Sequence, residues 1–125
     1  MRILLDTHIY LWAVIDDEKL TTKAREIITQ ANEVFVSSAS IWEISIKQAL
    51  GKIEADINLL ATTIKEIGFI ELPINSNHAI VLNRLPNIHR DPFDRILIAQ
   101  AIHEPMHFLT ADQNLKEYSE LIIKV

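Results

Sequence analysis

Cysteine is absent from the 125-residue chain, and only two glycines are present, Gly51 and Gly68. Without cysteine there is no disulfide framework, no thiolate nucleophile and no cysteine-ligated zinc or iron–sulfur site. A dinucleotide fingerprint, a phosphate-cradling P-loop and a hydrolase nucleophile elbow each need closely spaced glycines, whereas these two lie seventeen positions apart. The composition therefore excludes several large classes of enzyme.

Long hydrophobic runs are also missing. The N-terminal stretch meets Asp6 after only three apolar residues, Ile3, Leu4 and Leu5, and no later run approaches the roughly 18 residues that span a bilayer. We therefore expect neither a secretory signal nor a contact with a membrane. Together with the absence of cysteine, this favours a cytoplasmic protein.

Positive charge is in deficit, because 12 Lys and Arg face 17 Asp and Glu, which gives a formal net charge of −5. A negative protein repels nucleic acid at long range, so composition alone argues against such a partner. Hydrophobic residues make up 49% of the chain, a share typical of a globular protein. We expect a single domain over residues 1–125 with a substantial buried core.

Hydrophobic spacing predicts an α/β fold with a largely parallel sheet, because short apolar runs alternate with longer segments of helical period. Strands are expected at 3–5, 34–37, 69–72, 107–110 and 121–125. Helices are expected at 7–14, 22–30, 40–50, 57–67, 77–85, 92–102 and 114–118. Gly51 and Gly68 fall where two of these helices should stop.

Two acidic residues lie just beyond predicted strands. Asp6 follows the strand 3–5, and Asp112 follows the strand 107–110. Open α/β sheets bind their ligands at the carboxyl ends of strands, so both positions are candidates for a site. An aspartate between a strand and a helix is also a good helix N-cap, and for either residue taken alone this structural interpretation is favoured.

Glu43 lies three residues after Ser40, which is the spacing of a capping box at the start of a helix. It could equally pair with Lys47 one helical turn later. Apolar neighbours such as Ile41 and Ile44 surround it, and a carboxylate that is partly removed from water needs a cation nearby.

The segment His89-Arg90-Asp91-Pro92-Phe93-Asp94-Arg95 places two acids at the start of an apolar helix. Asp91 has the position of an N-cap, with Pro92 as the first helical residue. Asp94 falls in the first turn, and residues 96–102 are apolar almost all round, which is typical of a buried helix. We interpret Asp91 as a cap and Asp94 as a candidate for the active edge of the sheet.

These carboxylates can form a functional site only if the fold brings them close together. Two carboxylates ~4 Å apart repel by about 4 kcal/mol at an effective dielectric of about 20, so a cluster needs a cation. Carboxylate-rich, all-oxygen sites suit Mg²⁺ or Mn²⁺ rather than zinc. A site of this kind is typical of enzymes that hydrolyse phosphodiester bonds. The candidate ligands in this chain are Asp6, Glu43, Asp94 and Asp112.

Three other signals have simpler interpretations. The string from His103 to His107 matches the spacing of a helical zinc-peptidase motif, but Pro105 is incompatible with that helix. His8, close to Asp6, is best explained by packing. Trp12 and Trp42 could stack on bases, although at helical spacing among apolar residues they are more often part of the core or of a dimer interface.

Four segments occur in the order typical of one family, namely Leu4 to Trp12, Ser37 to Lys52, His89 to Ala101 and Leu109 to Asp112. Over essentially its whole length the chain resembles a PIN-domain ribonuclease of the VapC toxin type, and residues 89–95 are the most specific match. The resemblance implies a three-layer α/β/α fold around a parallel five-stranded sheet in the order 3-2-1-4-5.

The same resemblance implies an endoribonuclease that depends on Mg²⁺ or Mn²⁺ and hydrolyses RNA with a metal-activated water. It implies a toxin that a small antitoxin protein inhibits, and a homodimer. The acids that it marks as catalytic and metal-binding are Asp6, Glu43, Asp94 and Asp112, with Asp91 as a candidate fifth ligand. Residues that we expect to position substrate are Thr7, Thr110, Arg90 and Arg95.

Two other functional classes stay open. A receiver-like signalling domain also gathers acids around Mg²⁺, but it expects an acid pair in the first loop, where this chain offers only Asp6. A non-catalytic regulatory or dimerisation module would use the acids merely as helix caps. The net charge does not decide against RNA, because setting aside the five candidate acids leaves 17 − 5 = 12 acids against 12 bases.

Overall fold

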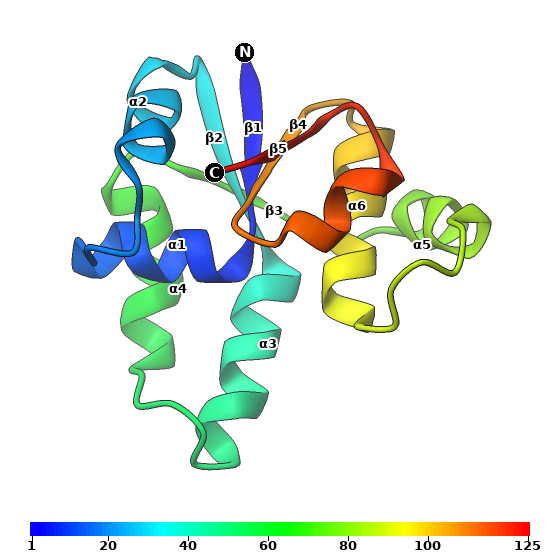
Figure 1. The fold of residues 1–125 in the computed structure, drawn as a ribbon. Helices are drawn as coiled ribbons and strands as arrows, with labels where there is room; N and C mark the ends of the chain where they lie inside the picture. The colour runs from blue at the N-terminus through cyan, green and yellow to red at the C-terminus, as the bar shows by residue number, and fades with distance from the viewer.

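A parallel five-stranded sheet runs through the middle of the protein in the computed structural model, which describes residues 1–125 (Figure 1). The strands are β1 (Arg2–Leu5), β2 (Glu33–Ser37), β3 (Ile70–Leu72), β4 (His107–Thr110) and β5 (Ile122–Lys124). Their order is β3-β2-β1-β4-β5, and every neighbouring pair is parallel. The predicted α/β fold and strand order are confirmed. Receiver-like sheets have the order 2-1-3-4-5, so the receiver alternative is wrong for this fold.

Six α-helices and one 3₁₀-helix connect the strands. The α-helices are α1 (Thr7–Ile15), α2 (Thr22–Gln30), α3 (Ser38–Ala49), α4 (Ile57–Glu66), α5 (Ser76–Arg84) and α6 (Pro92–His103). The segment expected as a helix at 114–118 is instead the 3₁₀-helix η1 (Gln113–Tyr118). None of the helices is both long enough and apolar enough to cross a membrane.

Each face of the sheet has its own buried cluster, because successive residues of a strand point to opposite sides. In β1, Ile3 and Leu5 join one cluster and Leu4 joins the other. Helices α1, α2 and α4 cover the first face, while α6 and η1 pack on the second. Figure 1 shows this division, with α5 lying outside α6.

Helix α3 begins two residues earlier than predicted. The Ser37 hydroxyl caps it by accepting a hydrogen bond from the Ala39 N–H at 3.0 Å, so β2 leads directly into the helix. At its other end, α3 stops at Gly51, which has a φ of +73°, and α4 stops likewise at Gly68, with a φ of +86°. Both glycines occupy the left-handed conformation that ends a helix, as predicted.

The zinc-peptidase string is not helical. Helix α6 ends at His103, and β4 already begins at His107. Between them, Glu104 lies 2.6 Å from Nε2 of His78, a fully buried histidine of α5. This segment therefore joins a helix to a strand and does not form a metal-binding turn.

The parallel arrangement brings the ends of three central strands to one edge. Leu5 of β1 pairs in register with Val36 of β2 and with Leu109 of β4. The residues that follow these strands are therefore neighbours in space although they are far apart in the sequence. Helices α1 and α3 both start at this edge.

Candidate active site

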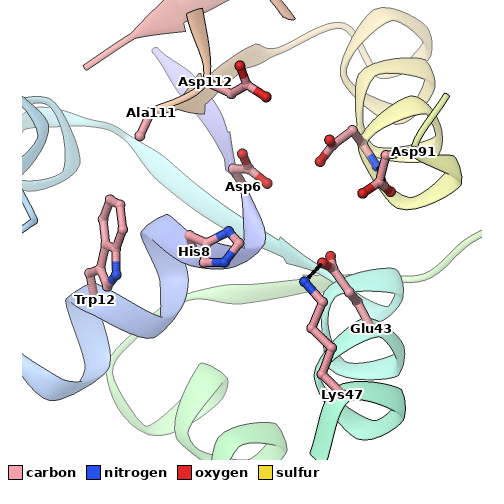
Figure 2. Close-up of a pocket in the computed structure, with 9 residues that line it drawn as sticks. Asp6, His8, Trp12, Glu43, Lys47, Asp91, Ala111 and Asp112 are labelled. Atoms are coloured by element: carbon pink, nitrogen blue, oxygen red, sulfur yellow. Dashed lines mark hydrogen bonds and ion pairs between the residues drawn. The ribbon is translucent and has the colours of Figure 1, made fainter. Parts of the chain in front are cut away.

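A pocket of about 340 Å³ opens at this edge of the sheet (Figure 2). It collects residues from the ends of β1 and β4, from α1 and α3, and from the start of α6. All five acids that the sequence singled out line it. The complete set of lining residues is Asp6, His8, Trp12, Glu43, Lys47, Asp91, Asp94, Ala111 and Asp112.

Asp6 lies at the floor of the pocket, with 6% of its surface exposed. Its Oδ1 accepts a hydrogen bond from the Thr7 N–H at 2.7 Å, and its Oδ2 accepts one from Thr110 Oγ1 at 2.6 Å. Burial raises the pKa of Asp6, and these two hydrogen bonds oppose that rise only in part. Asp6 is thus both the N-cap of α1 and a member of the acidic pocket.

Glu43 is also buried, with 4% of its surface exposed, and it lies in the second turn of α3. The capping-box interpretation is wrong, because Ser37 rather than Ser40 is the N-cap. Glu43 Oε1 accepts a hydrogen bond from Thr7 Oγ1 at 2.8 Å, and its Oε2 accepts one from Lys47 Nζ at 2.8 Å. The hydrogen bond to Glu43 raises the pKa of Lys47, so this lysine is a firmly held counter-ion.

Asp91 and Asp94 enter the pocket from the first turn of α6. Asp91 is the N-cap, and its Oδ1 accepts hydrogen bonds from the N–H groups of Phe93 (2.8 Å) and Asp94 (3.3 Å). Burial, and then the negative charges of Asp6, Asp91 and Glu43, raise the pKa of Asp94 to about 7. The predicted cap at Asp91 is therefore confirmed, and the same residue also lines the pocket.

Asp112 completes the acidic set from the end of β4. Its N–H donates to Thr110 Oγ1 at 3.0 Å, and its Oδ1 accepts from the Asn114 N–H at 2.9 Å. Because the Thr110 hydroxyl also donates to Asp6, one buried threonine ties two pocket acids together.

His89 is a site residue that sequence reasoning did not single out. Its Nε2 lies 3.0 Å from Asp94 Oδ2, and His89, Asp94 and Asp112 offer ligand atoms that all lie within 4.8 Å of one another. The His89 N–H donates to the Tyr118 hydroxyl at 2.7 Å, a contact between residues 29 positions apart. Only its position beside the acids of the same short segment could have marked it in the sequence.

The four residues expected to position substrate lie in two different places. Thr7 and Thr110 are buried and hold the carboxylates of Glu43 and Asp6, respectively. Arg90 is exposed and lines a neighbouring polar pocket together with Arg95.

Arg95 is engaged in contacts outside the acidic pocket. Its guanidinium donates to the carbonyl oxygens of Pro86 (2.9 Å) and Leu82 (3.4 Å) and to the Tyr118 hydroxyl (3.2 Å). The structure therefore does not bring either arginine into the carboxylate pocket.

The donor set of the pocket fits a divalent cation. Five carboxylates face one lysine, and the pKa values of two of the acids, Asp6 and Asp94, are raised in the way expected of buried groups without a sufficient counter-charge. Hard oxygen ligands of this kind suit Mg²⁺ or Mn²⁺. The residues that could hold such an ion are Asp6, Glu43, Asp91, Asp94 and Asp112, with His89 orienting Asp94.

The strand order and the acidic pocket at the carboxyl edge together define a class of protein. The model of the PIN domain family matches residues 3–121, and the chain belongs to this family. It is 26% identical over 123 residues to the Ribonuclease VapC22 of Mycobacterium tuberculosis, a match that covers 93% of this chain and 91% of the relative.

Two solved structures share the fold. The crystal structure of VapBC2 from Rickettsia felis, bound to a DNA fragment from their promoter, superposes with a TM-score of 0.70 and 14% identity, covering 100% of this chain and 98% of that one. FitAcB from Neisseria gonorrhoeae superposes with a TM-score of 0.63 and 15% identity, covering 98% of this chain and 96% of that one.

The raised pKa of Asp94 predicts a pH-dependent loss of stability in metal-free protein. The folded state holds the proton with a pKa of about 7, against the ordinary aspartate value of 3.8, so stability should fall as the pH rises from about 4 to about 7. Asp94→Asn should therefore melt several degrees above wild type near pH 8 and close to wild type near pH 4. Thermal melts in EDTA at low salt measure this difference.

The exposed Glu18 provides the control for this experiment, because Glu18→Gln removes one negative charge outside the pocket. An Asp94→Asn variant that melts well below wild type at pH 8 would show that the carboxylate chiefly stabilises the first turn of α6.

The double role of Thr110 predicts a second stability effect. Thr110→Val leaves a buried Asp6 oxygen and the Asp112 N–H without their partner, which should lower the free energy of unfolding by about 1–3 kcal/mol. Thr110→Ser keeps the hydroxyl and should lose clearly less. Urea unfolding of both variants tests this, and a Thr110→Val variant as stable as wild type would show that the hydroxyl contributes nothing.

Proposed function

We propose that the protein is a metal-dependent endoribonuclease and the toxin of a toxin–antitoxin pair. The observation that carries the proposal is the convergence of five acids and one lysine in a single pocket of a PIN domain. The match to a ribonuclease over most of both chains supports RNA as the substrate. The non-catalytic alternative accounts for the caps at Asp6, Asp91 and Asp112, but it gives no reason for the buried Glu43.

In this proposal Asp6, Glu43, Asp94 and Asp112 hold Mg²⁺ or Mn²⁺, with Asp91 as a fifth candidate. When bound, the ion supplies a Lewis acid that activates water for attack on phosphorus and stabilises charge on the phosphate. The absence of cysteine is no obstacle, because the nucleophile is water.

The protein itself contributes fixed carboxylate positions. Thr110 orients Asp6, Thr7 orients Glu43, and His89 orients Asp94. Groups held in this way need little rearrangement to receive a cation, which is the advantage of a preorganised site. In the metal-free protein Lys47 offsets one of the charges through its ion pair with Glu43.

The proposed protein partners follow from the resemblance to ribonucleases of the VapC toxin type. We propose an antitoxin protein that blocks the pocket, a homodimer and a cytoplasmic location. The antitoxin is supported by the fold shared with VapBC2 and FitAcB. Exposed apolar residues at four-residue spacing offer a surface for self-association, namely Trp42 and Ile46 on α3 and Leu50 at its C-cap.

An RNA cleavage assay tests the enzymatic part of the proposal. Purified protein should cut a labelled RNA pool with Mg²⁺ or Mn²⁺ and not with EDTA. Asp6→Asn and Asp94→Asn should each lower the rate by about 100-fold or more, since even loss of an outer partner of a metal ligand commonly costs 10–100-fold. Glu18→Gln should cut as wild type does. Cleavage that survives both chelation and substitution would refute the assignment to these acids.

Expression in bacterial cells tests the toxin part. Wild-type protein should arrest growth, because uncontrolled cleavage of cellular RNA stops protein synthesis, and Asp94→Asn should abolish the arrest. Growth curves and immunoblots measure the effect and the protein level. Harmless wild-type protein at high levels in cells without an inhibitor would contradict this role.

A further inference from the structure

Two rings on α1 face the acidic pocket. His8 and Trp12 lie one helical turn apart, so their side chains share one face of the helix. Their ring centroids are 6.0 Å apart, and the planes are tilted by 45°, so neither ring covers the other by stacking. Figure 2 shows His8 beside Asp6 and Trp12 one turn farther along α1, with Asp91 and Glu43 across the pocket.

Trp12 is held in place by its surroundings. It packs against the buried cluster beneath α1, and it also lines an apolar groove with residues such as Ile53 and Leu59. It is therefore half-buried, with its position fixed on one side and the pocket on the other. His8 is exposed, and it lines the pocket but not the groove.

The chemistry of the pocket creates a need for uncharged binding contacts. Five of its nine lining residues are acids, so phosphate groups are repelled wherever a cation does not screen them. Stacking between a base and an aromatic ring does not depend on charge and accepts any base. An aromatic wall beside carboxylates can therefore bind the part of a nucleotide that the acids do not repel.

We propose that Trp12, assisted by His8, is a stacking platform for a base adjacent to the phosphate that is cut. This proposal rests on the proposed ribonuclease function, and it names the residues that position the RNA. One side of the indole packs against the core, as the simpler interpretation expects. The side that faces the pocket is the part that would stack on a base. Trp12 is thus a positioning residue for the substrate.

Two substitutions separate stacking from packing. Trp12→Phe keeps an aromatic face, whereas Trp12→Leu keeps an apolar side chain without one. The leucine variant should raise KM for a short RNA roughly 5- to 150-fold, the range that corresponds to the loss of one stacked base, with kcat little changed. The phenylalanine variant should retain most of the affinity. Equal KM values for the two variants would overturn the proposal.

Fluorescence gives a readout that needs neither metal nor cleavage. The chain has two tryptophans, so Trp42→Phe leaves Trp12 as the only reporter, and Trp12→Phe leaves Trp42. The probe is a single-stranded oligoadenylate with methylphosphonate linkages, which has no backbone charge and no phosphodiester to cut. An abasic oligomer with the same linkages is the control.

Quenching by the adenylate probe in Trp42→Phe, without quenching by the abasic probe or in Trp12→Phe, is the expected result. No quenching at Trp12, equal quenching by the abasic probe, or quenching at Trp42 would each overturn the proposal. His8→Ala should weaken the quenching at Trp12. Failure of the ribonuclease function is recognised separately, because wild-type protein would then leave RNA intact even with Mg²⁺ or Mn²⁺.

Discussion

Repulsion between carboxylates at one edge of the sheet is the constraint on which the arrangement of the site depends. Burial strengthens this repulsion, and the pKa of Asp94 rises to about 7 as a consequence. The protein limits the cost with neutral donors and one cation. Thr110 and Thr7 donate to Asp6 and Glu43, and Lys47 forms an ion pair with Glu43. The remaining deficit of positive charge is what makes the pocket suited to a divalent ion.

Helix caps and site acids are the same residues in this protein. Asp6, Asp91 and Asp112 each cap the helix that follows, and each also lines the pocket. The two roles are compatible because a carboxylate has two oxygens. In Asp91 and Asp112, Oδ1 alone accepts from the backbone, so Oδ2 stays available to the pocket. A cap also fixes the side chain at the point where strand gives way to helix, which is the edge where parallel sheets place their sites.

The overall charge of −5 described the chain poorly because it averaged the pocket with its surroundings. The five acids of the pocket account for the whole excess, and the remaining acids and bases balance at 12 each. The electrostatic repulsion of a nucleic acid is therefore concentrated at the pocket itself. The proposed cation and the proposed stacking on Trp12 would act at that place, the first on phosphate and the second on a base.

The sequence by itself determined the α/β class, most element positions, the stops at Gly51 and Gly68 and the cap at Asp91, because these depend on local spacing and backbone preference. The strand order came from the resemblance, and only the tertiary structure showed which side chains meet. The start of α3 at Ser38 moved Glu43 into the second turn, where it reaches Thr7.

The direction in which a side chain points could likewise not be predicted from the local sequence pattern. Asp94 and Arg95 are adjacent in sequence, but successive residues point about 100° apart around a helix, so one enters the pocket and the other binds Pro86 and Tyr118. The contact between His89 and Tyr118 joins residues 29 positions apart, which no local pattern encodes. Local spacing therefore defined the candidates, and the packing of helices on a parallel sheet decided which of them share a site.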